Sequence, residues 1–293
     1  MSFLHMLESI RTPWLTAFFS WVTRLGEEVV FVGVLLIVLW CVDKRSGYRL
    51  FSVFFVCSTV NELLKLIFRV PRPWVRDPSL QTIESAKGAA TGYSFPSGHT
   101  AVAVSLMGSL AVMIKRRWAT IVSIILILLV GFSRMYLGVH TPADVFVSLL
   151  VAVSLFFFML WVFHKVDRTP WQEGLVLAVL TGIGILCAVL TLIFDFSPDV
   201  REKVWLLLGC SSGMLIAWWI DRKWVHFETK TRTRWQQVVK LVVGLLLVLG
   251  MRFFLASLFQ RIILDKAIAD GLRYMLIILF AVGVYPVTFR LYQ

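Results

Sequence analysis

The sequence predicts an all-α protein: a polytopic membrane bundle of about nine transmembrane helices, preceded by an amphipathic helix in the membrane interface. Hydrophobic residues make up 59% of the 293 residues, charged residues make up only 16%, and the mean hydropathy is +0.83. A water-soluble fold of this size could not bury so much apolar surface. Apolar runs long enough to cross a bilayer also recur along the chain, with short polar loops between them.

The first predicted element is the amphipathic helix, which we place within residues 1–27. Its apolar side chains recur at helical spacing, while Glu8, Arg11 and Arg24 interrupt them. A segment of this kind is expected to lie in the plane of the interface, with Trp14 as an anchor.

The membrane spans follow, and two predicted parts contain them. The first five form a core, residues 28–165, and the last four form a transmembrane extension, residues 166–293. The predicted spans are 28–43, 48–70, 98–115, 118–137, 142–164, 172–194, 203–220, 237–258 and 272–291.

Basic residues set the predicted orientation. With nine spans, the Lys and Arg residues after the first, third, fifth and seventh spans fall on one side, which the positive-inside rule makes cytoplasmic. These loops explain the net charge of +12, so no nucleic-acid partner is predicted. We expect an integral protein of the cell (inner) membrane. Its non-cytoplasmic face, opposite the basic loops, is expected to be turned toward the periplasm or exterior.

Three polar clusters interrupt the apolar pattern. They are Lys65-x6-Arg72-Pro73, Pro96-Ser97-Gly98-His99 and Ser133-Arg134-x5-His140-x3-Asp144. In the predicted topology they fall at the ends of the second and fourth spans and at the starts of the third and fifth. All four positions lie on the non-cytoplasmic side, so one shared site is expected there.

Three cations and a helix start in these clusters suit a phosphate group. Arg72 and Arg134 can hold phosphate oxygens in a bidentate manner, and Lys65 supplies a point charge. Ser97 and Gly98 begin a predicted helix whose free N–H groups attract an anion, and Ser97 is expected to cap it. The alternative is that the cations merely extend toward lipid headgroups.

The two histidines supply the predicted reaction chemistry. A neutral His140 ring can attack phosphorus, with Asp144 fixing its tautomer, while His99 can protonate the leaving alkoxide. The alternatives are an interfacial histidine beside an ordinary helix cap, and a His–Asp pair that caps a helix.

Two further residues are predicted to support the site from outside the phosphate cradle. Glu62 lies one turn before Lys65 and can pair with it, and Ser133 precedes Arg134. No cluster of metal-ligand residues appears near the motifs, so neither a metal ion nor another cofactor is predicted.

The three clusters, complete and in order, resemble the signature of the type 2 phosphatidic acid phosphatase superfamily. The resemblance covers roughly residues 30–165 and implies a metal-independent membrane phosphatase that acts on a lipid phosphate partner. It implies the same roles for the histidines: a phosphohistidine on His140, with His99 as the acid.

Several substrates fit this resemblance. Polyprenyl diphosphate (such as undecaprenyl diphosphate) in a bacterial membrane is the leading expectation, ahead of phosphatidate, phosphatidylglycerol phosphate and sphingoid phosphate. A sugar phosphate is an alternative, because glucose-6-phosphatase belongs to the same superfamily. A lipid transporter or structural protein with a vestigial site is another, because the last four spans contain no motif.

Overall fold

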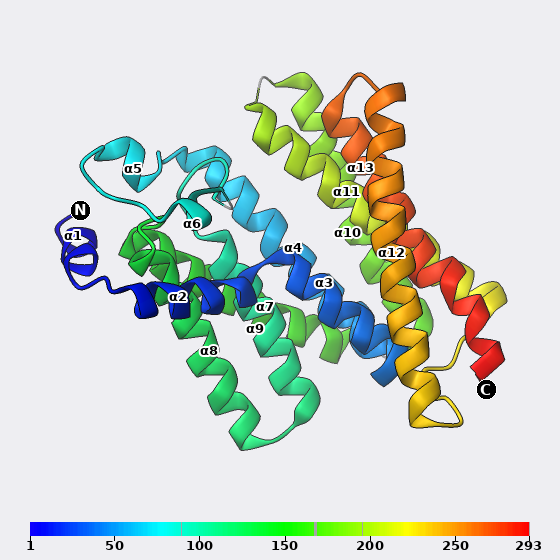
Figure 1. Ribbon diagram of the computed structural model, residues 1–293. Helices are drawn as coiled ribbons and strands as arrows, with labels where there is room; N and C mark the ends of the chain where they lie inside the picture. The colour runs from blue at the N-terminus through cyan, green and yellow to red at the C-terminus, as the bar shows by residue number, and fades with distance from the viewer. Residues whose placement is uncertain (89, 167–168, 195, 293) are drawn as a thin grey trace. The chain divides into compact units, whose positions relative to one another are not determined.

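The computed structural model describes residues 1–88, 90–166, 169–194 and 196–292, and these form helices and loops with no strand among them (Figure 1). They cluster into two compact units. The first joins Met1–Val32 to Val56–Trp161, and the second joins Gly33–Phe55 to Val162–Gln293. The all-α prediction is confirmed, while the predicted division at residues 27 and 165 stays a prediction.

Seven helices in the described part of the chain are long and apolar enough to cross a membrane, so the polytopic class is also confirmed. A bent pair, Pro13–Gly26 with Glu28–Val42 at 54°, would make eight if it forms one span. The predicted number of nine is not confirmed, because two of the predicted spans are short helices. One of them, α7 (Gly98–Ile114), has 17 residues and rises about 25 Å, against a hydrocarbon core of about 30 Å.

The N-terminal segment in the first unit differs from the single helix predicted there. It forms α1 (Ser2–Ser9), α2 (Pro13–Val22) and the 3-10 turn η1 (Thr23–Gly26). The break falls before Pro13, which lacks an N–H group and therefore begins a new helix rather than continuing the old one.

This segment also packs on the rest of the first unit. The Phe19 ring lies 4.6 Å from the Tyr136 ring, between centroids, and Val22 packs with Ala103 and Val130. Figure 1 shows α2 lying beside α8. One apolar face of the segment is therefore covered by protein, while Trp14 and Trp21 remain exposed.

The helices with the motifs belong mainly to the first unit, although α4 begins and α9 ends within the second. Short loops between these helices place all the motif residues at helix ends. The elements are α4 (Lys44–Phe68), α5 (Pro73–Arg76), α6 (Glu84–Gly88), α7, α8 (Arg117–Tyr136) and α9 (Pro142–Lys165).

The second unit contains the long C-terminal helices. Its elements are the second half of α3 (Glu28–Ile37), η2 (Val38–Val42), α10 (Pro170–Ile193), α11 (Pro198–Ile220), η3 (Asp221–Val225), α12 (Arg234–Ile262), α13 (Lys266–Leu279), η4 (Phe280–Val284) and η5 (Tyr285–Tyr292).

Glycines bring α11 and α13 into backbone contact. A Cβ atom on Gly209 would overlap the Gly271 carbonyl, and one on Gly213 would lie 2.6 Å from the Met275 oxygen. Small residues four apart allow membrane helices to approach in this way. This pair forms the most extensive helix–helix contact that the described residues show within the second unit.

Candidate active site

The ends of four helices meet in the first unit. The Ser97 N–H donates to the Asp144 carbonyl at 3.1 Å, which joins the start of α7 to the start of α9. The His140 N–H donates to the Arg134 carbonyl at 3.3 Å, and Arg72, just beyond α4, reaches the His140 ring. The structure thus brings together residues from all three predicted motifs.

Asp144 faces one nitrogen of the His140 ring. The His140 Nδ1 atom lies 3.4 Å from Asp144 Oδ2, and that oxygen accepts hydrogen bonds from Ser94 Oγ at 2.6 Å and Thr141 N at 2.7 Å. The carboxylate favours a proton on Nδ1, which leaves the lone pair on Nε2. Burial lowers the pKa of the His140 ring, so the ring is neutral and able to act as a nucleophile.

Arg72 is buried beside that second nitrogen. Its Nη1 atom lies 2.9 Å from His140 Nε2, and its other N–H groups donate to the carbonyls of Gly92 at 3.0 Å and Thr91 at 2.6 Å. Backbone acceptors therefore fix the guanidinium in place. A phosphoryl group on His140 Nε2 would lie directly next to this cation.

Lys65 lies over the start of α7. Its Nζ atom is 2.9 Å from Glu62 Oε1, so the predicted pairing is present, and both side chains are largely buried. A Cβ atom on Gly98 would lie only 3.7 Å from Nζ. The missing side chain at Gly98 therefore leaves the ammonium group open to a ligand on the helix start.

Ser97 occupies the N-cap of α7 without making the predicted side-chain cap. Its Oγ atom instead accepts a hydrogen bond from Thr100 Oγ1 at 2.9 Å, and its carbonyl accepts one from Ser148 Oγ at 2.6 Å. The predicted cap is wrong because the neighbouring hydroxyl occupies Oγ. The Ser97 hydroxyl proton is still available to an anion.

His99 lies two residues after Ser97 and is half-buried, with its Nε2 atom buried in the site. Its Nε2 atom has no hydrogen-bond partner in the described part of the chain. The charges of Arg134, Lys65 and Arg72, and the His140 ring, are all close enough to act on it. The three cations disfavour a proton on this ring until a phosphate dianion offsets their charge, so the unpartnered nitrogen is open to a bound phosphate ester.

Arg134 is fully buried, at 0% exposure. Its Nη1 atom donates to Thr23 Oγ1 at 2.8 Å, while Nε and Nη2 have no partner among the described residues. Leaving buried guanidinium N–H groups unpaired is costly, so a ligand is expected to complete them. The neighbouring Ser133 hydroxyl donates to the Val130 carbonyl at 2.6 Å, within its own helix.

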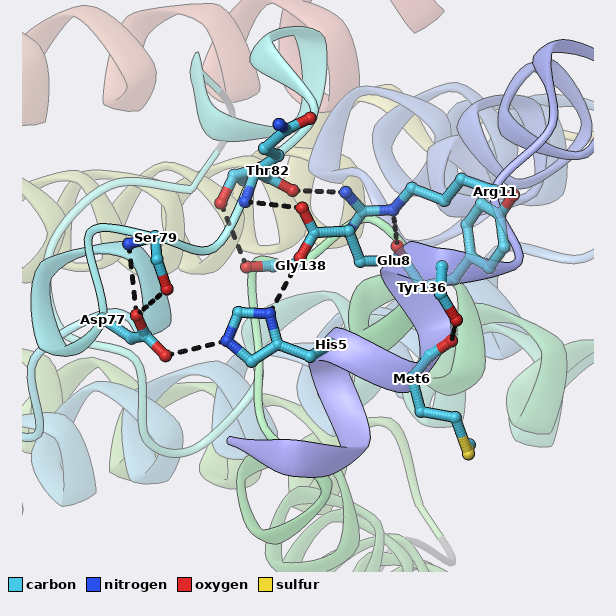
Figure 2. Close-up of polar contacts among 11 residues, drawn as sticks. His5, Met6, Glu8, Arg11, Asp77, Ser79, Thr82, Tyr136 and Gly138 are labelled. Carbon is cyan, nitrogen blue, oxygen red and sulfur yellow. Dashed lines mark hydrogen bonds and ion pairs between the residues drawn. The ribbon is translucent and has the colours of Figure 1, made fainter.

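The N-terminal segment also braces the turn that precedes His140 (Figure 2). The Arg11 side chain donates from Nε to the Tyr136 carbonyl at 3.0 Å and from Nη1 to the Gln81 carbonyl. Gly138 follows with a φ of +80°, a conformation that favours glycine. These bonds tie the turn to the loop before α6.

His5 makes a second connection between this segment and the same loop. Its Nε2 atom lies 2.9 Å from Asp77 Oδ2, and its Nδ1 atom lies 3.0 Å from Glu8 Oε2, as Figure 2 shows. Asp77 in turn accepts a hydrogen bond from the Ser79 hydroxyl at 2.6 Å. The first helix is therefore fastened to the loop by charged groups outside the membrane spans.

Sequence analysis misses Thr23 and Ser94, which hold the side chains of Arg134 and Asp144. Neither lies in a motif, and Thr23 lies 111 residues from its partner along the chain. The one available signal is that both Arg134 and Asp144 require further partners once they are buried.

A metal site finds no support in the described ranges. No group of three or more His, Cys, Asp or Glu side chains there could hold a metal ion. The expectation of a metal-independent reaction stays a prediction.

The sequence of this chain is similar to those of known proteins. The family model of the PAP2 superfamily matches residues 46–168, and the model described as "PAP2 superfamily phosphatase, transmembrane extension" matches residues 205–293. No solved structure matches the chain.

Named relatives match over longer stretches. A "Probable sphingosine-1-phosphate phosphatase" of Dictyostelium discoideum is 30% identical over 73% of this chain and 56% of its own length. A dihydrosphingosine 1-phosphate phosphatase of Schizosaccharomyces pombe is 26% identical over 74% of the chain and 54% of its own.

An undecaprenyl-diphosphatase, BcrC of Bacillus subtilis, is 37% identical over 33% of this chain and 48% of its own length. The chain spans about half the length of the relatives it matches. Two superfamily models that together cover more than half of the residues, and a site built from all three motifs, show that this chain belongs to the PAP2 superfamily.

Proposed function

We propose that this protein is a membrane phosphatase that hydrolyses lipid phosphate or diphosphate esters through a phosphohistidine. The row Arg72–His140–Asp144 is the observation that supports this most directly. It combines a neutral ring nitrogen, a carboxylate that orients the ring, and a fixed cation where phosphate charge would develop.

The reaction has two steps in this proposal. His140 Nε2 attacks the terminal phosphorus, its bond to the leaving oxygen breaks, and His99 in its protonated form gives its proton to that oxygen, which belongs to an alkoxide in a monoester and to a phosphate in a diphosphate. Water then attacks the phosphohistidine while His99 accepts the water's proton, which releases phosphate and restores both rings. Lys65, Arg72 and Arg134 hold the phosphoryl oxygens throughout, with the Ser97 hydroxyl and the open start of α7 at Gly98.

The relatives' names support a lipid substrate. Their printed substrates, sphingosine 1-phosphate and undecaprenyl diphosphate, share a long apolar tail that ends in a phosphate. The basic loops support a site on the non-cytoplasmic side of the cell membrane, facing the periplasm or exterior. A lipid in the outer half of the bilayer would then reach the site from the membrane.

Phosphate release from a substrate panel tests this function. The panel contains a sphingoid phosphate, phosphatidate and a polyprenyl diphosphate in mixed micelles, with glucose 6-phosphate as the soluble arm. We expect release from at least one lipid, unchanged by chelator, and a loss of about 10³-fold in His140→Ala. An exposed histidine near the end of α9, far along the chain from the motifs, serves as the control in His164→Ala, which should keep release above half of the wild-type rate.

Trapping the intermediate tests the chemistry itself. Rapid quenching with labelled substrate should leave phosphate on His140, in a bond that survives base and is cleaved by acid. Full activity in His140→Ala, or activity that collapses with chelator, would contradict the proposal. Release from the sugar phosphate alone would favour the glucose-6-phosphatase type of reaction.

A further inference from the structure

A second polar pocket adjoins Arg134, and neither catalytic histidine lines it. The pocket has a volume of about 110 Å³. Its polar lining comes from the N-terminal segment, from the loop helix α6 and from α8, and consists of Ser20, Thr23, Arg24, Glu27, Ser85 and Arg134. The N-terminal contributors all precede residue 46, where the superfamily match begins.

Two opposite charges in this pocket have unfilled bonding capacity. Arg134 presents two N–H groups that lack a partner in the described chain. Within the described part of the chain, the Glu27 carboxylate takes part in no hydrogen bond or ion pair, although its charge acts on Arg134. The two groups face one cavity without pairing, so the pocket has a donor side and an acceptor side.

The position of Glu27 is fixed by close packing of the turn before it. A Cβ atom on Gly26 would lie 2.7 Å from the His99 carbonyl and 2.9 Å from Val130 Cγ1. The same turn presents Thr23 to Arg134 at 2.8 Å. The backbone that carries Glu27 is therefore packed against the helix of the proposed proton donor and linked to the proposed phosphate-binding cation.

We propose that this pocket binds an ammonium group carried next to the phosphate ester, with Glu27 as its acceptor. This inference rests on the proposed function and names the preferred substrate class: long-chain amino-alcohol phosphates. Their phosphate would accept hydrogen bonds from the two unpaired N–H groups of Arg134, and their ammonium group would pair with the Glu27 carboxylate. One ligand would then supply partners to both side chains. A second phosphate in the same place would meet the Glu27 carboxylate as a like charge, while Arg24, the other cation of the lining, is exposed and stacks on the Trp21 ring at 4.2 Å.

The test compares three monophosphates with tails of equal length. Sphinganine phosphate has the ammonium group, its N-acetyl derivative has the same hydroxyl without the charge, and octadecyl phosphate has neither. We expect the wild-type kcat/KM to be about tenfold higher for sphinganine phosphate than for the other two, since a charge-assisted hydrogen bond of this kind is typically worth that factor. In Glu27→Gln the three values should become equal.

A matched control removes a carboxylate outside the pocket. Glu84 is 83% exposed and pairs weakly with Lys87 at 3.3 Å, so Glu84→Gln should keep the wild-type preference. The readout is the ratio of the kcat/KM values of two substrates within one preparation, so it does not depend on the fraction of protein that folds. The N-acetyl comparison in the wild-type protein needs no variant at all.

Each outcome decides the inference. Equal wild-type values for the three lipids, or a Glu27→Gln variant that keeps the preference, would overturn the ammonium pocket and leave the proposed function standing. A wild-type preference for octadecyl diphosphate over all three would assign the pocket to a second phosphate and also overturn it. Hydrolysis of no lipid phosphate would reject the proposed function and this inference together.

Discussion

The Nη1 atom of Arg72 lies 2.9 Å from the Nε2 atom of His140, while Nδ1 of the same ring faces Asp144. A cation and an anion therefore bracket one imidazole. Asp144 favours a proton on Nδ1, and Arg72 lies beside Nε2, the nitrogen that is free to react. Phosphate oxygens arriving there would take over the hydrogen bond that the ring now receives.

Arg72→Lys should lower kcat by about 100-fold in phosphate release. Lysine keeps a charge but cannot make the bonds to Gly92, Thr91 and the ring together, so the cation loses its fixed position. Arg76→Lys, four residues further on and exposed, is the control and should change kcat less than twofold. An equal loss in both variants would argue against a placed guanidinium.

Asp144→Asn should reduce kcat by about 10²- to 10⁴-fold, because an amide no longer favours the proton on Nδ1 of His140. Quenched-flow measurement should show that formation of the phosphohistidine is the slowed step. Ser94→Ala removes only one of the hydrogen bonds to the carboxylate, and we expect a loss of about tenfold or less. A fully active Asp144→Asn would rule out the orienting role.

Thr23→Val should raise KM by about tenfold, since it removes the acceptor that holds Arg134 and leaves another buried N–H unpaired. Thr23→Ser retains the hydroxyl and should recover most of the loss. Measuring KM and kcat separately distinguishes weaker phosphate binding from simple unfolding. Identical kinetics in the valine variant would show that Arg134 needs no support from the N-terminal segment.

The contact between α1 and the loop at Asp77 should loosen as pH rises. Hydrogen bonds to Asp77 and then to Glu8 raise the pKa of His5, so this stabilisation is complete below about 6.5, the ordinary value. It is lost as pH rises through the raised value. Bonds from Ser79, and then from His5, lower the pKa of Asp77 to about 2, so the carboxylate remains charged through the mildly acidic range.

Hydrogen-exchange protection factors for α1, measured at pH 5 and at pH 9, check this prediction. Protection should fall at the higher pH in the wild-type protein and be independent of pH in His5→Ala. Protection that rises with pH would reverse the assigned sign.

Gly209→Ala should destabilise the protein by about 1–3 kcal/mol, because the added methyl group would overlap the Gly271 backbone. Gly250→Ala in α12 is the control: a Cβ there meets nothing within 4 Å, and we expect no loss. Thermal unfolding in detergent measures both. A stable Gly209→Ala would mean that α11 and α13 can separate at little cost.

The membrane helices and the motif residues of the site could be predicted, because short stretches of sequence specify them. Apolar runs predict the membrane helices, and the motif spacing predicts that Lys65, Arg72, His99, Arg134 and His140 gather at helix ends. These signals are short in range: each motif specifies its residues within twelve positions, and the predicted alternation between the two membrane faces places the motifs on one side.

The unpredicted part depends on packing between distant segments. The amphipathic pattern ahead of residue 28 is compatible with a membrane surface or with a protein surface, and only the contacts of Phe19 and Thr23 distinguish these. The count of spans fails for a related reason. The short α7 is apolar and more buried than α8 and α9, but its caps at Ser97 and Lys115 limit it to 17 residues.

The hydroxyl of Thr23 and the bare backbone of Gly26 contact the site from well ahead of Ser46, where the family match starts. A polypeptide trimmed to that match would keep every motif and lose the support behind its third cation. Chimeras that exchange the first 27 residues between relatives should then change which lipid is preferred, while the motif residues that carry out the reaction remain those of the host protein.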